Sequence, residues 1–403
     1  MAQEIKGSKK LLAGIKVLDF TQYLAGPSAT RILADLGANV IKIERTPSGD
    51  LGRKIHLVDH GQSAFFIAAC AGKKSVCVEI KHPKGKEIVY ELVRQADVVV
   101  ENYSPGVMAR LGLNYDTLKE LNPKLIMCSV SGYGQDGPYA KHTSFDIIAQ
   151  AQSGVMSMTG QPDGPPTYVG NYFGDPNAGI HGALAICAAL FSRAMTGEGQ
   201  YIDVSQLESL VYLDYINFPL YMMSHGEIVP QRFGGDFFNV CPYGVYKAKK
   251  GYVVLAVVEH QWPALTKAMG MPDLINKPEY QDNAARLDNR EALNDDLQGW
   301  LSQRCLNETM DQLVPSGGVV GPVYDAQRIM DDPHYQARED IIDIDDPELG
   351  KTKMLGVVPK FSETPGSVQH AGPTVGEHNQ HIYNSWLGLE EEDLSELSEQ
   401  GTI

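Results

Sequence analysis

The chain has 403 residues, 43% of them apolar, and carries a formal net charge of −16. This length and composition predict a globular protein with a large core and more than one domain. The acidic balance argues against a nucleic-acid-binding protein, because nucleic-acid phosphates select for a broad positive surface.

The first residues and the cysteines indicate the compartment. Residues 1–10 carry charges with no apolar stretch behind them, and the longest apolar run, residues 183–191, is far shorter than the roughly 18 residues that span a bilayer. The six cysteines form no CxxC pair and have no histidine at a zinc spacing. We therefore expect a cytoplasmic protein with reduced thiols, no membrane segment and no metal site.

Strands and helices alternate at a regular pace through the first part of the chain. Strand-like apolar runs lie at residues 15–20, 39–44, 75–80, 97–102 and 124–130. Helical patterns, such as residues 28–37 and 86–96, separate them. The alternation predicts a doubly wound, Rossmann-like parallel sheet that is covered on both faces. Ligands of such sheets bind beyond the carboxyl ends of the strands.

A further helix is expected from Pro176 to its stop at Gly197. Asp175 stands at the expected N-cap, where a carboxylate accepts hydrogen bonds from the free amides of the first turn. The positive end of the helix also favours an ionised carboxylate with a low pKa and a fixed direction. Asp175 could therefore be a cap, a nucleophile or both.

The residue pattern of the sequence changes near residue 225. Paired glycines, a hairpin-like turn at residues 248–251 and alternating aromatic positions predict a smaller α+β domain over residues 225–330. The large α/β domain is expected to span residues 1–224, and residues 331–403 turn to strand and loop again, as a return to that domain.

Common catalytic signatures are missing. GYGQDG at residues 132–137 matches GxGxxG after a strand, but Pro138 and Tyr139 stand where a dinucleotide site opens a helix. The chain has no GxxxxGK[ST], no HExxH and no GxSxG. His181 follows Asp175 on the expected helix and could act as a general base. A helix histidine that faces a pocket or the core more often has only a packing role, so we expect His181 at most to support the site residues.

Longer motifs carry a resemblance over essentially the whole chain. They are VLDFTQYLAGPSATRILADLGANVIKIER, VENYSPGVMARLG, SGYGQDGP, GDPNAG, TGEGQYIDVS and PTVGEH. The set resembles the class III coenzyme A transferases, the group that includes formyl-CoA and carnitine CoA-transferases and the related acyl-CoA racemases. The order and spacing of the motifs argue against chance agreement.

The resemblance implies that Asp175 is the nucleophile of a CoA-transferase. In this family the aspartate attacks an acyl-CoA carbonyl to give a mixed anhydride and CoA thiolate, the thiolate then forms an aspartyl-CoA thioester, and an incoming acid reverses the sequence. A carboxylate in this role needs to be oriented, partly desolvated and ionised. The implied substrates are a coenzyme A thioester as donor and a carboxylic acid as acceptor, with no permanently bound cofactor and no metal.

Gly234 and Gly235 are the expected backbone donors to the tetrahedral oxyanion. The family carries a glycine-rich loop in this region that closes over the aspartyl intermediate, and this chain has only a bare pair of glycines within RFGGDFF. A simple turn that leads into a hairpin is the alternative interpretation.

The resemblance also implies a CoA site. The positions that line this site in relatives are Arg45, Lys73, Lys74, Asn102, Tyr103 and Arg110. Arg45 follows a strand, where a cation can meet a diphosphate, whereas any single lysine could be a solvated surface charge. Tyr133 is expected beside them, where it would line the acyl pocket.

Tyr23, Leu24 and Tyr172 are expected to line the substrate pocket. Oxalate-using relatives carry a glutamine where Leu24 stands, so the leucine favours a less polar or differently shaped acid. Racemases of this fold carry a histidine where this chain has Phe145, which argues against a racemase.

Two alternative functions stay open. One is an acyl-CoA racemase or epimerase of the same fold, and the other is a non-catalytic acyl-CoA-binding protein in which Asp175 only caps its helix. Relatives form interlocked homodimers, with the large domain built from both chain ends. We therefore expect a homodimer whose other partners are acyl-CoA and small carboxylic acids, with neither nucleic acid nor membrane among them.

Overall fold

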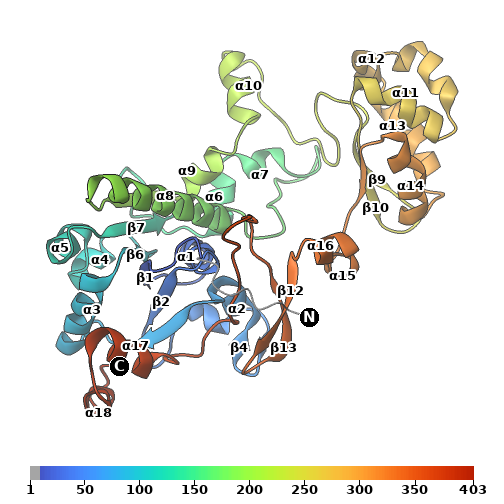
Figure 1. Ribbon diagram of the computed structural model, residues 1–403. Helices are drawn as coiled ribbons and strands as arrows, with labels where there is room; N and C mark the ends of the chain where they lie inside the picture. Colours follow the sequence, from blue (N-terminus) through green and yellow to red (C-terminus); the bar gives the residue numbers. More distant parts are fainter. Residues whose placement is uncertain (1–9) are drawn as a thin grey trace. The chain divides into compact units, whose positions relative to one another are not determined.

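The computed structural model describes residues 10–403, so most of the charged N-terminal segment lies outside the described residues (Figure 1). The chain divides into two compact units. The first unit contains Met1–Val155, Val169–Tyr215 and Pro333–Ile403. The second unit contains Met156–Tyr168 and Ile216–Asp332. The chain therefore leaves the first unit twice and ends in it.

A six-stranded parallel sheet forms the centre of the first unit, in the order β5-β2-β1-β6-β7-β8. Its strands are β1 Lys16–Asp19, β2 Asn39–Glu44, β5 Lys74–Cys77, β6 Val98–Glu101, β7 Ile126–Ser131 and β8 Tyr201–Ser205. The predicted parallel α/β sheet is confirmed. Strand order reverses between β1 and β6, and at such a point the loops beyond the strands diverge to leave a crevice for ligands.

Alternate side chains of the strands enter two separate cores, as the period of two in a strand requires. On one face, Val17, Val40 and Val98 pack with α1 (Ala25–Asp35) and α8 (Gly174–Thr196). On the other face, Leu18, Ile41 and their neighbours pack with α3 (Pro83–Gln95) and with α17 (Asn379–Leu387) from the C-terminal segment (Figure 1). The sheet is thus covered on both faces, which explains its near-continuous apolar strands.

The remaining elements of the first unit lie in connections and in the C-terminal segment. They are β3 Val58–Asp59, β4 Gln62–Ser63, α2 Ala64–Cys70, α4 Val107–Leu111, α5 Tyr115–Leu121, α6 Asp146–Gln152, α9 Gln206–Val211, α16 Pro333–Ala337, β12 Ile341–Asp346, β13 Gly350–Leu355 and α18 Glu391–Glu399. Tyr383 of α17 donates a hydrogen bond from its hydroxyl to the carbonyl O of Cys77, at 2.6 Å. This bond ties the C-terminal segment to strand β5.

The second unit has its own sheet and core. Its antiparallel strands, in the order β11-β10-β9, are β9 Tyr243–Lys247, β10 Tyr252–Ala256 and β11 Val320–Pro322. Its helices are α10 Asn217–Met223, α11 Trp262–Ala268, α12 Asn283–Asp288, α13 Arg290–Leu301, α14 Leu306–Leu313 and α15 Ala326–Asp331, while the short α7 (Val155–Met158) begins at the last residue of the first unit. Val253, Leu265 and Leu297 lie at the centre of this core.

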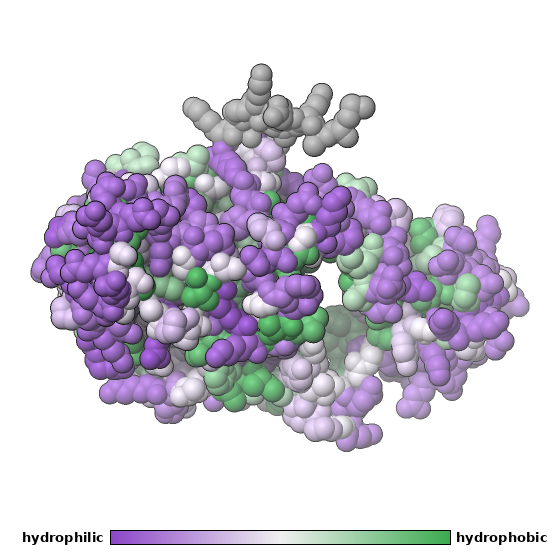
Figure 2. All heavy atoms as spheres, turned by 90° about the horizontal axis from the view of Figure 1, so that it is seen from below, coloured by the Kyte–Doolittle hydropathy of each residue, from purple (hydrophilic) through white to green (hydrophobic). Residues whose placement is uncertain are grey.

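Helix α8 is long and apolar enough to cross a membrane by length and composition alone, and a third of its most apolar stretch is buried. A single helix of this kind is weak evidence, because the core helix of a globular protein passes the same test. Here α8 packs on α1 and the sheet, yet Leu184, Phe191 and Met195 are 67%, 72% and 75% exposed. The face of the molecule shown in Figure 2 carries hydrophobic side chains interspersed among hydrophilic ones.

Candidate active site

Asp175 is the second residue of helix α8, which begins at Gly174 and ends at Gly197 in a left-handed conformation. The predicted end of the helix is confirmed, but the prediction that Asp175 is the N-cap is wrong. The N-cap position belongs to Phe173, whose side chain makes no capping hydrogen bond. The Asp175 carboxylate is therefore not engaged by the amides of the first turn.

Asp146 caps the helix from outside. This residue opens helix α6 and is buried. Its Oδ1 accepts the backbone N–H groups of Phe173 at 2.8 Å and Asp175 at 2.9 Å. Its Oδ2 accepts a hydrogen bond from Nε2 of Gln150 at 2.5 Å, and Oε1 of Gln150 accepts the backbone N–H of Val169 at 3.0 Å. The carboxylate and the amide together fix the chain that leads into the helix.

Gln206 contacts the Asp175 side chain directly. Its Nε2 donates a hydrogen bond to Oδ1 of Asp175. Gln206 is buried and is the first residue of α9, immediately after the carboxyl end of strand β8. The end of a parallel strand thus delivers an amide to the carboxylate, in the part of an α/β sheet where functional groups gather.

The pKa of Asp175 is raised to about 7, first by burial and second by the negative charge of Asp146. The predicted low pKa is therefore wrong. The hydrogen bonds expected to lower it are not made: the N–H of Asn177, in the first turn, donates to the carbonyl O of Phe173 at 3.3 Å. Burial and a neighbouring carboxylate both disfavour the charged form. Near neutral pH a substantial fraction of Asp175 is ionised, in a site that is largely shielded from water.

Gly174 allows this arrangement because three elements meet at its Cα. A Cβ there would lie 3.2 Å from Cδ1 of Leu210 in α9, 3.4 Å from Oδ1 of Asp146 and 3.5 Å from Cβ of Ala149 in α6. A side chain would press α6 and α9 away from the start of α8. The glycine before Asp175 thus lets side chains of α6 and α9 pack closely against the start of α8.

The expected pocket residues lie on two different supports. Tyr23 has a positive φ of 62°, is partly exposed, and donates its backbone N–H to Oδ1 of Asp50 at 3.2 Å. Leu24 is half-buried against a small cluster of Phe66, Ala69 and Cys70. This contact gives Leu24 a packing role in the loop beyond β1.

Tyr172 belongs to an aromatic group three residues before Asp175. Its hydroxyl lies 3.2 Å from Nε2 of His56, and its ring centroid lies 5.7 Å from that of Phe65. His56 and Phe65 are in edge contact as well, with centroids 5.6 Å apart. Three residues span at most about 11 Å of chain, so this group lies near the nucleophile candidate.

The loops beyond β1 and β6 are joined at the point where strand order reverses. The Asn102 side chain accepts the backbone N–H of Gln22 at 2.7 Å and donates to its carbonyl O at 2.8 Å. Tyr103 is half-buried and donates its backbone N–H to Glu101 at 2.7 Å. The Asn102 amide is thus occupied by the loop, while Tyr103 packs against the core of this face and stays partly exposed.

Lys73 is placed differently from the expectation. It is fully buried, and its Nζ lies 3.0 Å from Oδ2 of Asp19 and 2.9 Å from the carbonyl O of Pro27. A second buried pair, Lys42 with Asp50 at 2.7 Å, lies beside it, and both lysines lower the pKa of Asp19. The prediction of a direct CoA contact is corrected, because no exposed ammonium is left: Lys73 is a structural cation.

The other expected CoA contacts remain accessible. Arg45 and Arg110 are exposed, and Lys74 is half-buried with a pKa that desolvation lowers. Tyr133 forms an aromatic group with Tyr139 and His142, with ring centroids 5.8 and 6.1 Å away. These side chains are supplied by different loops around the carboxyl edge of the sheet, apart from Arg110 on α4 and Lys74 at the start of β5.

Gly234 and Gly235 lie in the second unit, whereas Asp175 lies in the first. Gly234 has a φ of 65°, and its N–H donates to the carbonyl O of Gly160 at 3.0 Å. The carbonyl O of Gly235 accepts the N–H of Val245 at 2.9 Å. The pair forms a turn that leads into strand β9, and the Gly234 amide is already engaged within its own unit.

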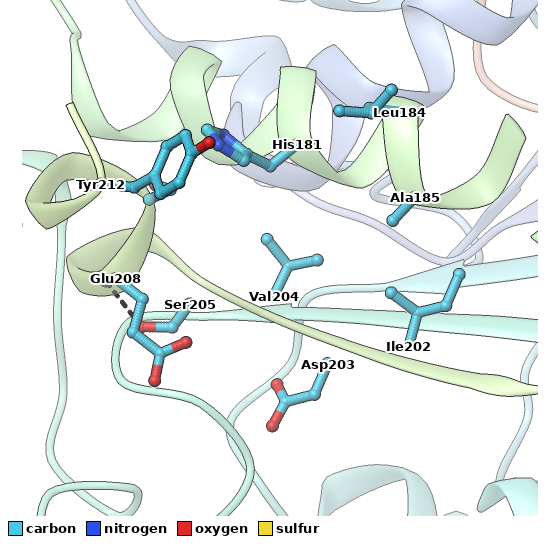
Figure 3. A pocket seen from close by; sticks show the side chains of 10 residues that line it. His181, Leu184, Ala185, Ile202, Asp203, Val204, Ser205, Glu208 and Tyr212 are labelled. Carbon is cyan, nitrogen blue, oxygen red and sulfur yellow. Dashed lines mark hydrogen bonds between the residues drawn. The ribbon is translucent and has the colours of Figure 1, made fainter. Parts of the chain in front are cut away.

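His181 lines a cavity of about 430 Å³ with residues of α8, β8 and α9 (Figure 3). Its Nδ1 lies 2.9 Å from the carbonyl O of Asn177, and its ring is in edge contact with Tyr212. Neither Asp175 nor Gln206 lines this cavity. His181 is thus packed in the manner expected for a helix histidine.

Asp146 and Gln206 are the two site residues that sequence reasoning did not assign. Asp146 was visible only as the neighbour of Phe145, and Gln206 only as the residue after an expected strand. The position of Gln206 beyond a strand could have marked it as a candidate. Nothing local could have joined either residue to Asp175, which lies 29 and 31 positions away.

Comparison with known proteins gives consistent matches over the whole length. The family description "CoA-transferase family III" matches residues 12–379. Succinyl-CoA--D-citramalate CoA-transferase of Chloroflexus aurantiacus is 37% identical, over 97% of this chain and 98% of that protein. Formyl-CoA:oxalate CoA-transferase of Streptomyces coelicolor is 34% identical, over 98% and 99%. The crystal structure of a CAIB/BAIF family protein from Brucella suis matches with a TM-score of 0.85 and 32% identity, over 93% of this chain and 99% of that one.

Proposed function

This chain belongs to CoA-transferase family III, and we propose that it moves CoA from an acyl-CoA donor to a carboxylic acid acceptor through covalent intermediates on Asp175. The transfer of CoA between a thioester and an acid follows from the family and from the activities in its relatives' names. The covalent role of Asp175 is the proposal. The observation that carries it is the Asp175 carboxylate itself, which is shielded from water, is oriented by a hydrogen bond from Gln206 and has a pKa of about 7.

The proposed reaction begins with attack by one oxygen of ionised Asp175 on the carbonyl carbon of the acyl-CoA. A C–O bond forms, the C–S bond breaks, and CoA leaves as a thiolate, so a mixed anhydride remains. The thiolate then attacks Cγ of Asp175, which forms the aspartyl-CoA thioester and releases the donor acid as its carboxylate. An acceptor carboxylate reverses both steps and regenerates Asp175.

The environment of Asp175 supports this chemistry. A carboxylate in water is a weak nucleophile because its hydration shell must be removed before attack. Burial removes much of that shell in advance and raises the pKa to about 7. Asp146 contributes through its charge and fixes the backbone of the nucleophile through its hydrogen bond at 2.9 Å.

We propose that CoA binds beyond the carboxyl ends of the strands, near the point where strand order reverses. Arg45 and Arg110 have exposed side chains for its phosphates, and Tyr103 is a partly exposed aromatic residue beside them. Lys74 is half-buried and begins strand β5, so we propose no phosphate contact for it at this edge. Asn102 would act through the loop it braces rather than by direct contact.

For the acid, we propose a pocket lined by Tyr23, Tyr133 and the aromatic group of Tyr172. The relatives named above use succinyl-CoA with D-citramalate and formyl-CoA with oxalate, according to their names. The apolar Leu24 in the neighbouring loop favours an acid that is less polar than oxalate or differently shaped. Coenzyme A enters only as part of the thioester substrate.

We also propose a homodimer in which exposed apolar side chains of α8 are covered. Leu184, Phe191 and Met195 are too exposed for a helix that faces water alone. The two compact units would correspond to the large and small domains of each protomer, with residues 156–168 and 216–224 in the small domain rather than in the large one as predicted.

The proposed role of Asp175 is tested by turnover of Asp175→Asn with a panel of short dicarboxylates, hydroxy acids and aromatic acids. We expect the variant to lose nearly all CoA transfer, because an amide is not a competent nucleophile here. Asp116→Asn is the matched control, since Asp116 is exposed in the first turn of α5. Turnover by Asp175→Asn equal to that of the wild type would overturn the covalent role of Asp175. No CoA transfer by the wild type with any acid of the panel would instead favour a binding protein or a racemase.

A further inference from the structure

Gln206 has a contact with the proposed nucleophile that no other described side chain makes. Among residues 10–403, its Nε2 is the side-chain donor to the Asp175 carboxylate, and the bond is made to Oδ1. The neighbouring Asp146 bonds only to the backbone N–H of Asp175. The two oxygens of Asp175 are therefore unequal: Oδ1 is held by an amide, and Oδ2 is the oxygen left for a substrate.

The backbone that carries Gln206 is held by hydrogen bonds on both sides of the residue. Ser205 caps α9 by accepting the N–H of Glu208 at 3.2 Å, and it donates its hydroxyl to the carbonyl O of Gly132 at 3.2 Å. Ser209 donates its hydroxyl to the carbonyl O of Gln206 at 2.8 Å, and Asn177 of α8 donates to the carbonyl O of Ser209 at 2.7 Å. Helices α8 and α9 are thus tied together one turn behind the contact.

From this geometry we propose that Gln206 is a catalytic residue that holds Oδ1 of Asp175 through the whole reaction and stabilises the negative charge that develops on it. This proposal rests on the proposed function of Asp175. In the first step Gln206 is bonded to Oδ1, so Oδ2 is the oxygen that attacks the acyl-CoA. In the second step it donates to the oxygen on which charge accumulates.

The second step shows why the donor is needed on this oxygen. When the CoA thiolate attacks Cγ of the anhydride, the S–C bond forms and the π electrons of the carbonyl move onto Oδ1. Collapse of this oxyanion restores the carbonyl and breaks the Cγ–Oδ2 bond, so Oδ2 leaves with the donor acid. The acceptor acid later attacks the same Cγ, and Oδ1 carries the charge again. A preorganised donor on that oxygen lowers both barriers.

The nature of the donor also fits its place. A neutral amide can stay on an ionised carboxylate, an anhydride carbonyl or a thioester carbonyl without a change of its own charge. The backbone donor expected from Gly234 is bonded to Gly160 within the second unit, at 3.0 Å. Gln206 therefore supplies, from the first unit itself, a function that the glycine pair was expected to provide.

The test compares Gln206→Met with Gln200→Met in the full-length enzyme. Methionine keeps the length and helix propensity of glutamine but removes the donor. Gln200 is exposed and precedes the same strand β8 at its other end, so it controls for the exchange itself. We expect Gln206→Met to lower kcat by about 100-fold, in the range found for loss of one oxyanion donor, with KM for acyl-CoA almost unchanged. Gln200→Met should match the wild type.

A pH profile separates catalysis from a merely structural effect. The charged group that faces Asp175 is Asp146 on α6, while α9 presents the neutral Gln206. Loss of the amide donor disfavours the ionised carboxylate, so the midpoint of kcat/KM should move to higher pH in Gln206→Met. Gln206→Glu, which places another carboxylate there, should move it further in the same direction. Wild-type kcat and an unmoved midpoint in either folded variant would overturn the proposal.

Failure of this inference is distinguishable from failure of the proposed function. If Asp175→Asn is inactive while Gln206→Met and Gln206→Glu behave like the wild type, only the role of Gln206 is refuted. If Asp175→Asn is active, the covalent role of Asp175 fails whatever the Gln206 variants do, and the inference fails with it.

Discussion

The Asp175→Asn substitution should affect stability as well as turnover, in a way that depends on pH. The pKa of Asp175 is raised from 3.8 to about 7 on folding, so the folded chain binds this proton more tightly than the unfolded chain. The stability that comes from the proton is complete below about pH 4 and is lost as the pH rises through about 7. The whole difference, about 3 pH units, corresponds to about 4 kcal/mol.

Only part of that free energy is lost within the pH range in which unfolding is measured. Between about pH 5 and about pH 8 the wild type should lose about 2 to 3 kcal/mol through this group, and Asp175→Asn should lose none of it. The asparagine can still accept the hydrogen bond of Gln206, so packing near the site is kept. The variant should therefore become more stable than the wild type as the pH rises, although Asp175 was first expected to act as a stabilising cap.

Urea denaturation followed by circular dichroism, at both pH values, measures this difference. The transition of interest is that of the first unit, which contains Asp175. Asp116→Asn should show the same pH dependence as the wild type, because Asp116 is exposed. A stability gap between Asp175→Asn and the wild type that does not change with pH would refute the raised pKa and the reasoning built on it.

Three further predictions concern binding, pH and the buried charges. Arg110→Ala should raise KM for acyl-CoA about tenfold and far more than KM for the acid, and equal changes in steady-state kinetics would show that Arg110 is not at the CoA site. The wild-type kcat/KM should fall as the pH drops below about 7, because protonated Asp175 cannot attack, and a flat profile from about pH 5 to about pH 8 would contradict this. Lys73→Met should cost about 3 to 5 kcal/mol in urea unfolding, because it leaves the buried Asp19 carboxylate without its ion-pair partner. A stable variant with only a raised KM for acyl-CoA would restore Lys73 to the CoA site.

The fold of the first unit could be predicted because its signal is local and repeated. The expected strand at residues 39–44 is strand β2, and the expected strand at residues 15–20 contains β1, Lys16–Asp19. Buried parallel strands read as apolar runs, and the helices between them have their own period. The stop of α8 at Gly197 was also predictable, since a left-handed residue that ends a helix is most often glycine.

The site was predictable only as far as single residues carry it. Asp175 was assigned the right neighbourhood and the wrong local role, because the cap of its helix comes from Asp146, which is distant in sequence. Lys73 and Lys74 are adjacent in sequence, yet the first is buried in an ion pair and the second is half-exposed. Such outcomes depend on which side chains the assembled sheet brings together, and local patterns do not contain that information.

The central claim is that Asp175 becomes covalently activated, and peptide mass spectrometry tests it most directly. The protein is incubated with several acyl-CoAs and then quenched with hydroxylamine, which converts an anhydride or thioester of a carboxylate into a hydroxamate. The account predicts a mass change on the peptide that contains Asp175, absent in Asp175→Asn and present in Asp116→Asn. No mass change with any donor, in folded protein that still binds CoA, would contradict it.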